Sequence, residues 1–192
     1  MRCVFFTGLL VALPSVAFAG EGQASPARPH EFTAGVVTSF FADNHDITPT
    51  AWALDIAYHY RPQRRGVWQS LRFTEGLRFG SADNGDRVFD VYWRGEMIAN
   101  VGAWTPTLGP EFGVSTLGRH FIHVESPYPN DLTDLHETKL SPFYLALVAT
   151  PLRFCFSRFT VSAFELSLGA PVAGIGTVAR FQLGILHVGG TL

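Results

Sequence analysis

The stretch AWALDIAYHYR at residues 51–61 decides the fold, because its side chains change character at every step. The even-numbered positions are occupied by Trp52, Leu54, Ile56, Tyr58 and Tyr60. The odd-numbered positions are occupied by Ala53, Asp55, Ala57, His59 and Arg61. Successive side chains of a β-strand point to opposite faces, so this stretch is predicted to be a strand with one apolar and one polar face.

Seven further segments alternate in the same way and bring the expected number of strands to eight. They cover residues 32–41, 71–79, 88–102, 108–117, 143–156, 160–169 and 178–188. Glu75 is an exception, since it falls on the apolar side of its segment. Short alternating segments separated by turns are typical of barrels that cross a membrane with strands. The sequence therefore predicts an all-β fold, an eight-stranded antiparallel up-and-down transmembrane β-barrel.

Segment 143–156 contains an irregularity at Pro151. Before this proline the apolar residues, such as Phe143 and Leu147, have odd numbers, whereas Leu152 and Phe154 after it have even numbers. Proline cannot donate a hydrogen bond to a neighbouring strand, and one extra residue in a β-bulge reverses the alternation. We expect a bulge at this proline; the alternative is that the strand ends there.

The N-terminus has the pattern of a secretory signal peptide. Arg2 gives it a positive start, residues 4–13 are almost entirely apolar, and Ala-Phe-Ala at 17–19 presents small residues for cleavage. The apolar run is too short for a membrane-spanning helix, which needs roughly 20 apolar residues. The expected organisation is a signal peptide at 1–19, a short N-terminal segment at 20–30 and a single barrel domain at 31–192.

Composition excludes several other classes of protein. A chain of 192 residues suits one domain. Only 16% of the residues are charged and the formal net charge is −2, so no basic excess points to a nucleic-acid partner. Removal of the leader would leave Cys155 as the one cysteine, and one thiol cannot form an intramolecular disulfide.

The connections between the segments support an orientation in the membrane. They are expected at residues 43–49, 62–66, 81–86, 104–106, 118–140, 157–158 and 170–176. The odd-numbered connections are expected to be longer than the even-numbered ones, as in barrels with short periplasmic turns and long outer loops. Aromatic residues near the strand ends are expected to form a girdle at the lipid headgroups. These residues are Trp52, Tyr60, Trp68 and Trp104.

With these segments, turns and girdle, the chain resembles the small eight-stranded outer-membrane β-barrels of the OmpA and opacity type over nearly all of its mature length. The resemblance is architectural and rests on no diagnostic motif. It implies an outer-membrane location, contact with membrane lipid, insertion by the barrel-assembly machinery and a monomer. Such barrels usually end in an aromatic residue, whereas this chain ends in Gly189-Gly190-Thr191-Leu192.

The polar face is expected to point into the lumen, where it gathers charges of both signs. These residues are Asp55, His59, Arg61, Arg72, Arg78, Asp90, Arg94, Glu96, Glu111, Glu165 and Arg180. Eight strands leave an interior that side chains can fill, and buried charges must pair. We expect a packed ionic network that holds the barrel together; the functional alternative is a gate or a proton path.

The longest connection, at residues 118–140, is the expected place for contact with a surface partner, since loops on rigid scaffolds often carry function. Its candidate residues are His120, His123, Tyr128, Asp131, Asp134 and His136. A disordered tip is equally compatible with this composition. The histidines and carboxylates match no spacing of a known metal motif, so neither a metal nor a cofactor is predicted.

The sequence also bears on two alternative functions. Some barrels of this kind are lipid A deacylases with a His-x-Ser pair, but none of the seven histidines has serine two residues later, and no enzyme is predicted. The second is a soluble periplasmic barrel, similar to a lipocalin, that binds a small apolar ligand. A lipocalin has its apolar face inside and a membrane barrel has it outside, so the direction of the apolar face separates the two.

Overall fold

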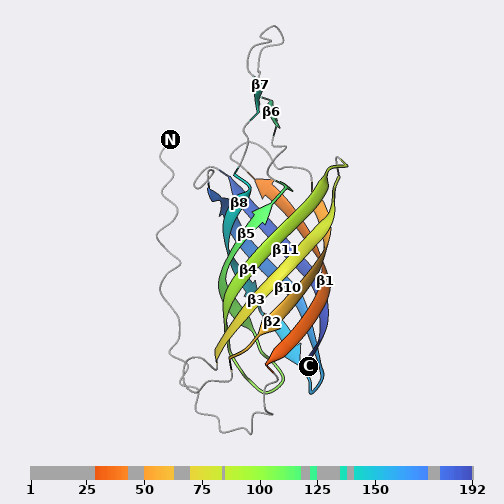
Figure 1. Cartoon of the computed structure of the whole chain (residues 1–192), viewed down its shortest axis with the longest axis vertical. Helices are drawn as coiled ribbons and strands as arrows, with labels where there is room; N and C mark the ends of the chain where they lie inside the picture. The colour runs from red at the N-terminus through yellow and green to blue at the C-terminus, as the bar shows by residue number, and fades with distance from the viewer. Residues whose placement is uncertain are drawn as a thin grey trace.

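In the computed structural model, strands that hydrogen-bond to their neighbours close into a barrel (Figure 1). The structure describes residues 29–42, 50–62, 70–83, 85–117, 122–124, 135–137, 141–172 and 178–191. The barrel strands are β1 (His30–Ala42), β2 (Ala51–Tyr60), β3 (Leu71–Ala82), β4 (Arg87–Ile98), β5 (Thr107–Ser115), β8 (Phe143–Thr150), β9 (Leu152–Cys155), β10 (Phe159–Pro171) and β11 (Ala179–Thr191). Neighbouring strands are antiparallel throughout.

Strands β8 and β9 act as one strand, because both pair with β10 on either side of Pro151. Pairing of β11 with both β1 and β10 closes the sheet. The predicted eight-stranded antiparallel barrel is therefore confirmed. Two short strands, β6 (Ile122–Val124) and β7 (Leu135–Glu137), form a separate hairpin in the longest connection. In the parts of the chain that the structure describes, no helix has the length and apolarity needed to cross a membrane.

The start of β1 and the end of β11 lie at one end of the barrel, and the β6–β7 hairpin lies beyond the other (Figure 1). The predicted regular alternation of long and short connections is wrong. Ten residues separate β2 from β3, against eight between β1 and β2 and four between β3 and β4. The third connection is short because β3 continues past residue 79, where Gly80 and Ser81 pair with both neighbouring strands. The 27-residue connection between β5 and β8 remains the longest.

The direction of the two faces follows from burial. Large apolar side chains of every barrel strand, such as Leu54, Leu77 and Trp93, are exposed on the outer wall, while the charged side chains between them are buried. Glu75 points outward among them, as its position in the sequence indicates. This arrangement matches a membrane barrel and is the reverse of the apolar interior that a lipocalin needs.

A line of irregularities crosses three neighbouring strands, and we call it the seam. It lies at Pro151–Leu152, at Ala163–Phe164 in β10 and at Ile185–Leu186 in β11. Inward positions change from even to odd numbers there, as with Thr150 and Arg153, Ser162 and Glu165, and Gly184 and His187. Phe164 has a positive φ of 56°, which is uncommon for a bulky residue.

The seam explains why the strand continues beyond Pro151. Since the three strands change together, the register of β10 with its neighbours is the same on both sides. The extra residue is accommodated where these three strands meet their other neighbours, β1 on one side and β5 on the other. In β11, Ile185 is skipped where the register with β1 shifts between Val36 and Val37. At the other border Thr107 pairs with Thr150, but the Thr105 amide bonds the Arg153 carbonyl, 2.8 Å away.

Candidate functional site

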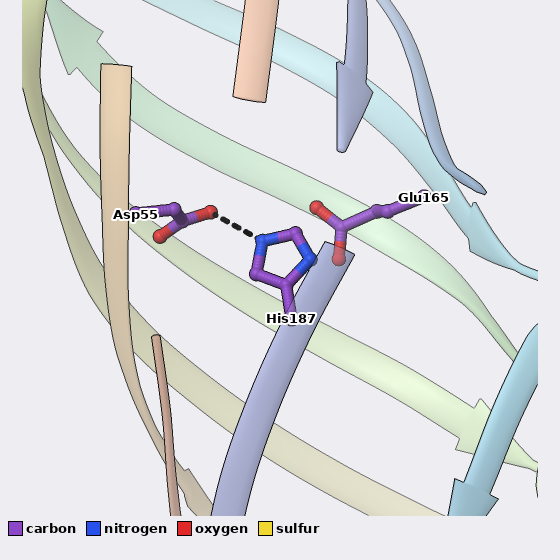
Figure 2. A group of neighbouring side chains, drawn as sticks. All are labelled: Asp55, Glu165 and His187. Carbon is purple, nitrogen blue, oxygen red and sulfur yellow. Dashed lines mark ion pairs between the residues drawn. The ribbon is translucent and has the colours of Figure 1, made fainter. Parts of the chain in front are cut away.

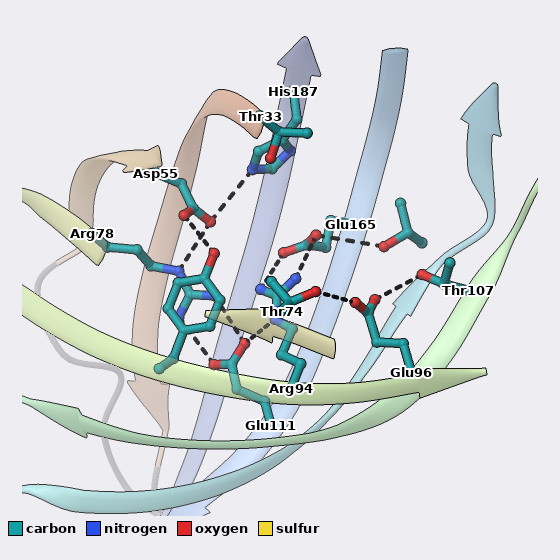
Figure 3. Close-up of polar contacts among 12 residues, drawn as sticks. Thr33, Asp55, Thr74, Arg78, Arg94, Glu96, Thr107, Glu111, Glu165 and His187 are labelled. Carbon is teal, nitrogen blue, oxygen red and sulfur yellow. Dashed lines mark hydrogen bonds and ion pairs between the residues drawn. The ribbon is translucent and has the colours of Figure 1, made fainter. Parts of the chain in front are cut away.

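The barrel interior is filled by a network of ion pairs and hydrogen bonds (Figure 3). Ten of the eleven residues predicted to line the lumen are buried in it: Asp55, His59, Arg72, Arg78, Asp90, Arg94, Glu96, Glu111, Glu165 and Arg180. The strand alternation brings them together from six of the barrel strands, because every second residue must point inward. The interior is thus polar and tightly packed.

At the centre, two arginines share one carboxylate. Arg78 donates two hydrogen bonds to Glu111, of 3.0 and 2.9 Å, and Arg94 donates one of 2.5 Å. Arg94 also reaches across the lumen to Glu165 on β10 with bonds of 2.9 and 2.6 Å. Such two-pronged contacts fix the angle as well as the distance between the groups. They tie β3, β4, β5 and β10 to one another through the lumen.

Two tyrosines support this centre. The Tyr92 hydroxyl donates to Asp55 at 2.6 Å, and the Tyr144 hydroxyl donates to Glu111 at 2.8 Å. The guanidinium of Arg78 lies 3.7 Å from the centroid of the Tyr92 ring, and that of Arg180 lies 3.9 Å from the Tyr144 ring. Cations stacked on aromatic faces are stabilised where water is excluded.

His59 belongs to a second group, where both of its ring nitrogens are used. Nε2 lies 2.9 Å from the Thr33 hydroxyl and Nδ1 lies 2.7 Å from the Thr74 hydroxyl. The Thr74 hydroxyl donates in turn to Glu96, at 2.8 Å. A third group contains the ion pair of Arg180 with Asp90. There Arg180 Nε and Nη1, Asp90 Oδ1 and the Gln182 amide have no hydrogen-bond partner.

Arg61 lies outside this network, in contrast to the prediction. It follows the last residue of β2, is half-buried, and donates to Asn100 at 3.3 Å. The strand alternation would point it inward, but β2 ends one residue earlier. Its side chain therefore lies at the rim and contacts the connection between β4 and β5.

Sequence reasoning missed two buried charged residues, Glu31 and Arg153, and the buried histidine His187. Glu31 was missed because β1 starts at His30, ahead of the predicted residue 32. Glu31 pairs with Arg153 at 2.5 Å, across the lumen from β1 to β9. Extended from residues 180–184, the alternation of β11 would place His187 on the outer face, but the alternation reverses at the seam. The signal that could have found it is the adjacent apolar pair Ile185-Leu186.

Of the predicted girdle residues, Trp52, Tyr60 and Trp104 are exposed on the outer wall. The Trp104 indole donates to the Pro151 carbonyl at 2.7 Å. Trp68 lies outside the described residues, and so do the signal peptide and the loop residues His120, Tyr128, Asp131 and Asp134. For the remaining two loop residues the structure describes the backbone alone, in which His123 and His136 are register partners in the β6–β7 hairpin.

Asp55, Glu165 and His187 meet inside the barrel, and one ligand atom from each lies within 4.8 Å of the others (Figure 2). Next to them is a cavity of about 10 Å³, enough for about one water molecule. The three residues line this cavity together with His59, Arg94 and Arg153. This is the place in the network that could hold a small cation.

No protein-family model and no curated protein matches the sequence. Among solved structures, Neisserial surface protein A (NspA) matches with a TM-score of 0.56 and 11% identity, covering 85% of this chain and 97% of that one. Ail, the attachment invasion locus protein of Yersinia pestis, matches with a TM-score of 0.48 and 12% identity over 86% of this chain and 99% of that one. A structure of Ail in complex with the heparin analogue sucrose octasulfate gives a TM-score of 0.44 and 7% identity, covering 86% of this chain and 99% of that one. The chain therefore has the fold of the small eight-stranded outer-membrane β-barrels.

Proposed function

We propose that the chain is an outer-membrane β-barrel protein whose packed lumen holds the wall in shape and whose outer loops contact a partner at the cell surface. The observation that carries the proposal is the apolar outer wall. Exposed phenylalanine, leucine, valine, isoleucine and tryptophan side chains come from every barrel strand. A soluble protein rarely exposes so continuous an apolar surface, whereas lipid favours it.

The location follows from the wall and the leader together. Cleavage after Ala19 would release a chain whose residues 20–30 precede the barrel, and the assembly machinery would insert residues 31–192. Trp52, Tyr60 and Trp104 would lie at the headgroup level, where their rings are stabilised by a surface that is apolar on one side and wet on the other. The fold of a Neisserial surface protein supports a place in the cell envelope.

The paired lumen argues for a structural role of the interior. Arg72, Arg78 and Arg94 are held by carboxylates on neighbouring or opposite strands. A wide aqueous channel would need these side chains to line its wall, and instead they fill the space between the strands. Contact with a partner is assigned to the 118–140 connection, the longest one, because the other connections are too short to present a surface of comparable size.

The test is membrane fractionation of cells that express the chain, followed by gel electrophoresis of the detergent extract with and without boiling. We expect the protein in the outer-membrane fraction and a folded band whose migration changes on boiling. A soluble protein with no heat-modifiable band would overturn the membrane proposal. Deletion of residues 118–140 should leave the heat-modifiable band and remove binding to host or bacterial surfaces; unchanged binding would overturn the role of the loop.

A further inference from the structure

Asp55 on β2, Glu165 on β10 and His187 on β11 converge in the lumen from three strands (Figure 2). All three are buried, and one potential ligand atom of each lies within 4.8 Å of the others. One imidazole and two carboxylates are donors that suit a first-row divalent metal such as Zn²⁺. Three protein ligands leave a fourth tetrahedral position for water.

The surroundings of the His187 side chain indicate a bound ligand. Its side chain is 5% exposed, and neither ring nitrogen has a hydrogen-bond partner. His59 lies in the same lumen, yet both of its nitrogens are bonded by threonine hydroxyls. A buried polar group without a partner is unfavourable. The vacant nitrogens of His187 therefore point to a group that binds between it and the carboxylates.

The spacing within the cluster fits a shared metal better than a direct hydrogen bond. His187 Nε2 lies 3.5 Å from Asp55 Oδ2, beyond the usual range of about 2.7–3.2 Å for hydrogen bonds to oxygen. Two tetrahedral ligands that bind one zinc ion at about 2.0–2.2 Å lie roughly 3.3–3.6 Å apart. The observed separation falls in this range.

The barrel wall leaves room for the imidazole at two glycines. A Cβ atom at Gly35 would lie 2.2 Å from His187 Cδ2, and one at Gly184 would lie 2.6 Å from Cε1. Either alanine would push the ring out of place. The seam adds the second half of the arrangement, since Glu165 and His187 lie on opposite sides of it and His187 points inward because β11 reverses its alternation there.

The carboxylates are held in place by neighbours that leave space for a metal. Asp55 accepts hydrogen bonds from Arg78 at 3.2 Å and from Tyr92 at 2.6 Å, and Glu165 is held by Arg94. Partners of this kind orient metal ligands in known sites. The cavity of about 10 Å³ beside the cluster admits a particle of the size of one water molecule.

The charge of the interior also favours a cation. Among the described residues, six carboxylates are buried: Glu31, Asp55, Asp90, Glu96, Glu111 and Glu165. Five guanidinium groups face them: Arg72, Arg78, Arg94, Arg153 and Arg180. One negative charge is left over where the packed side chains exclude water, and an uncompensated buried charge is unfavourable.

From these observations we propose that Asp55, Glu165 and His187 bind a divalent transition-metal ion in the lumen, with zinc as the probe. The ion links β2, β10 and β11 from within, and so adds a contact between the second strand and the last two strands of the barrel. The site is independent of the loops and of any surface partner. A proton on His187 is the competing occupant, and the experiment distinguishes the two.

The full chain is refolded from urea into detergent micelles with ZnCl₂, passed through a desalting column, and analysed for zinc by mass spectrometry. We expect about one zinc ion per folded barrel, and a reduction of at least about tenfold in His187→Gln, because a direct ligand is lost. His30→Gln is the control, since His30 does not line the cavity and its Nδ1 already lies 2.6 Å from the Tyr58 hydroxyl, and it should retain the metal. Folding of each variant is checked by its heat-modifiable band.

Loop histidines are the other possible source of binding. A variant with His120, His123 and His136 changed to alanine should keep its zinc if the lumen site binds it. Loss of zinc in this variant, unchanged zinc in His187→Gln, or no zinc in the unmodified protein would overturn the proposal. An imidazolium signal from His187 at neutral pH in the presence of excess zinc would also overturn the proposal, because it would show that a proton and not a metal ion binds there.

X-ray absorption of the zinc-loaded unmodified protein keeps the test decisive if His187→Gln does not fold. One imidazole nitrogen among oxygen ligands, all at about 2.0–2.2 Å, is expected. Two or more imidazoles in the spectrum would contradict a site with a single histidine.

Discussion

Arg72 on β3 and Glu96 on β4 are register partners, and their side chains are joined by two parallel hydrogen bonds of 3.0 and 2.9 Å. The hydroxyls of Thr74 and Thr107 donate to the same carboxylate at 2.8 and 2.9 Å. Both charged side chains are buried. The pair is thus satisfied entirely by protein groups, so the loss of one partner leaves the other without a substitute.

The first prediction concerns this pair. Glu96→Gln should lower the free energy of unfolding by about 3–5 kcal/mol, because Arg72 would remain buried without its counter-charge. Replacement of both residues, as in Arg72→Met with Glu96→Leu, should cost less than the sum of the two single changes, since no charge is then stranded. Urea unfolding in detergent micelles measures Glu96→Gln, the double variant and its two single changes. Additive costs would contradict the pairing.

The second prediction uses two glycines. A Cβ atom at Gly76 would lie 2.3 Å from Cζ of the buried Tyr92 ring, whereas a Cβ atom at Gly95 would meet nothing within 4 Å. Gly76→Ala should therefore destabilise the barrel by about 1–3 kcal/mol through overpacking. Gly95→Ala should leave stability unchanged or slightly raised. If both changes had the same effect in urea unfolding, the tight packing of Tyr92 against β3 would be refuted.

The third prediction tests the outer wall. Leu77 is exposed in the middle of β3, where lipid would surround it. Leu77→Arg should make folding into lipid vesicles less favourable by about 2–4 kcal/mol, because a charge near the bilayer centre is unfavourable. Val101→Arg is the control, since Val101 is exposed in the connection between β4 and β5. Equal effects at the two positions would place Leu77 outside the hydrocarbon region.

The fourth prediction concerns the hydrogen bond that closes the irregularity at Pro151. Trp104 Nε1 donates to the Pro151 carbonyl at 2.7 Å. Trp104→Phe keeps an aromatic ring and removes the donor, so it should lower the free energy of unfolding by about 1 kcal/mol. Trp93→Phe serves as the comparison, because the Trp93 ring stacks on Phe112 and phenylalanine preserves that stack. A larger loss at Trp93 than at Trp104 would count against the role of the donor.

The fifth prediction is electrical. Because the charged side chains of the lumen pair with one another and fill it, the purified protein should give little or no steady conductance in planar lipid bilayers. Folding is verified beforehand by the heat-modifiable band. Large, long-lived open channels would mean that the network opens in the membrane.

Much of the fold follows from alternation alone. In β2, every second residue from Trp52 to Tyr60 points outward, and Asp55 and His59 point inward, as the sequence indicates. Sequence alternation cannot by itself tell which face is inside. The burial of the side chains shows that the polar face points inward. Eight strands leave an interior that side chains can fill, and here the charged side chains fill it and pair with one another.

The part that sequence reasoning missed lies where alternation is broken by contacts between strands. Pro151 reveals one irregularity through its chemistry. Neither Phe164 nor Ile185 is a glycine or a proline, so the only signal at these two positions is the apolar pair that Ile185 forms with Leu186. This is why alternation alone gives the wrong face for His187 and does not predict its cluster with Asp55 and Glu165.

The seam has a consequence for how this protein can change over generations. Deletion of Ile185 would leave Arg180 and His187 facing inward, because it removes the residue that reverses the alternation of β11. Phe164 of β10, which lies between the pairs Ala163–Leu186 and Glu165–Gly184, would then have no residue opposite it. Deletion of Phe164 would leave Ile185 without a residue opposite it in the same way. A related barrel with the same strand pairing must gain or lose the irregularity in all three strands at once. We therefore expect Pro151, Phe164 and Ile185 to be gained or lost together.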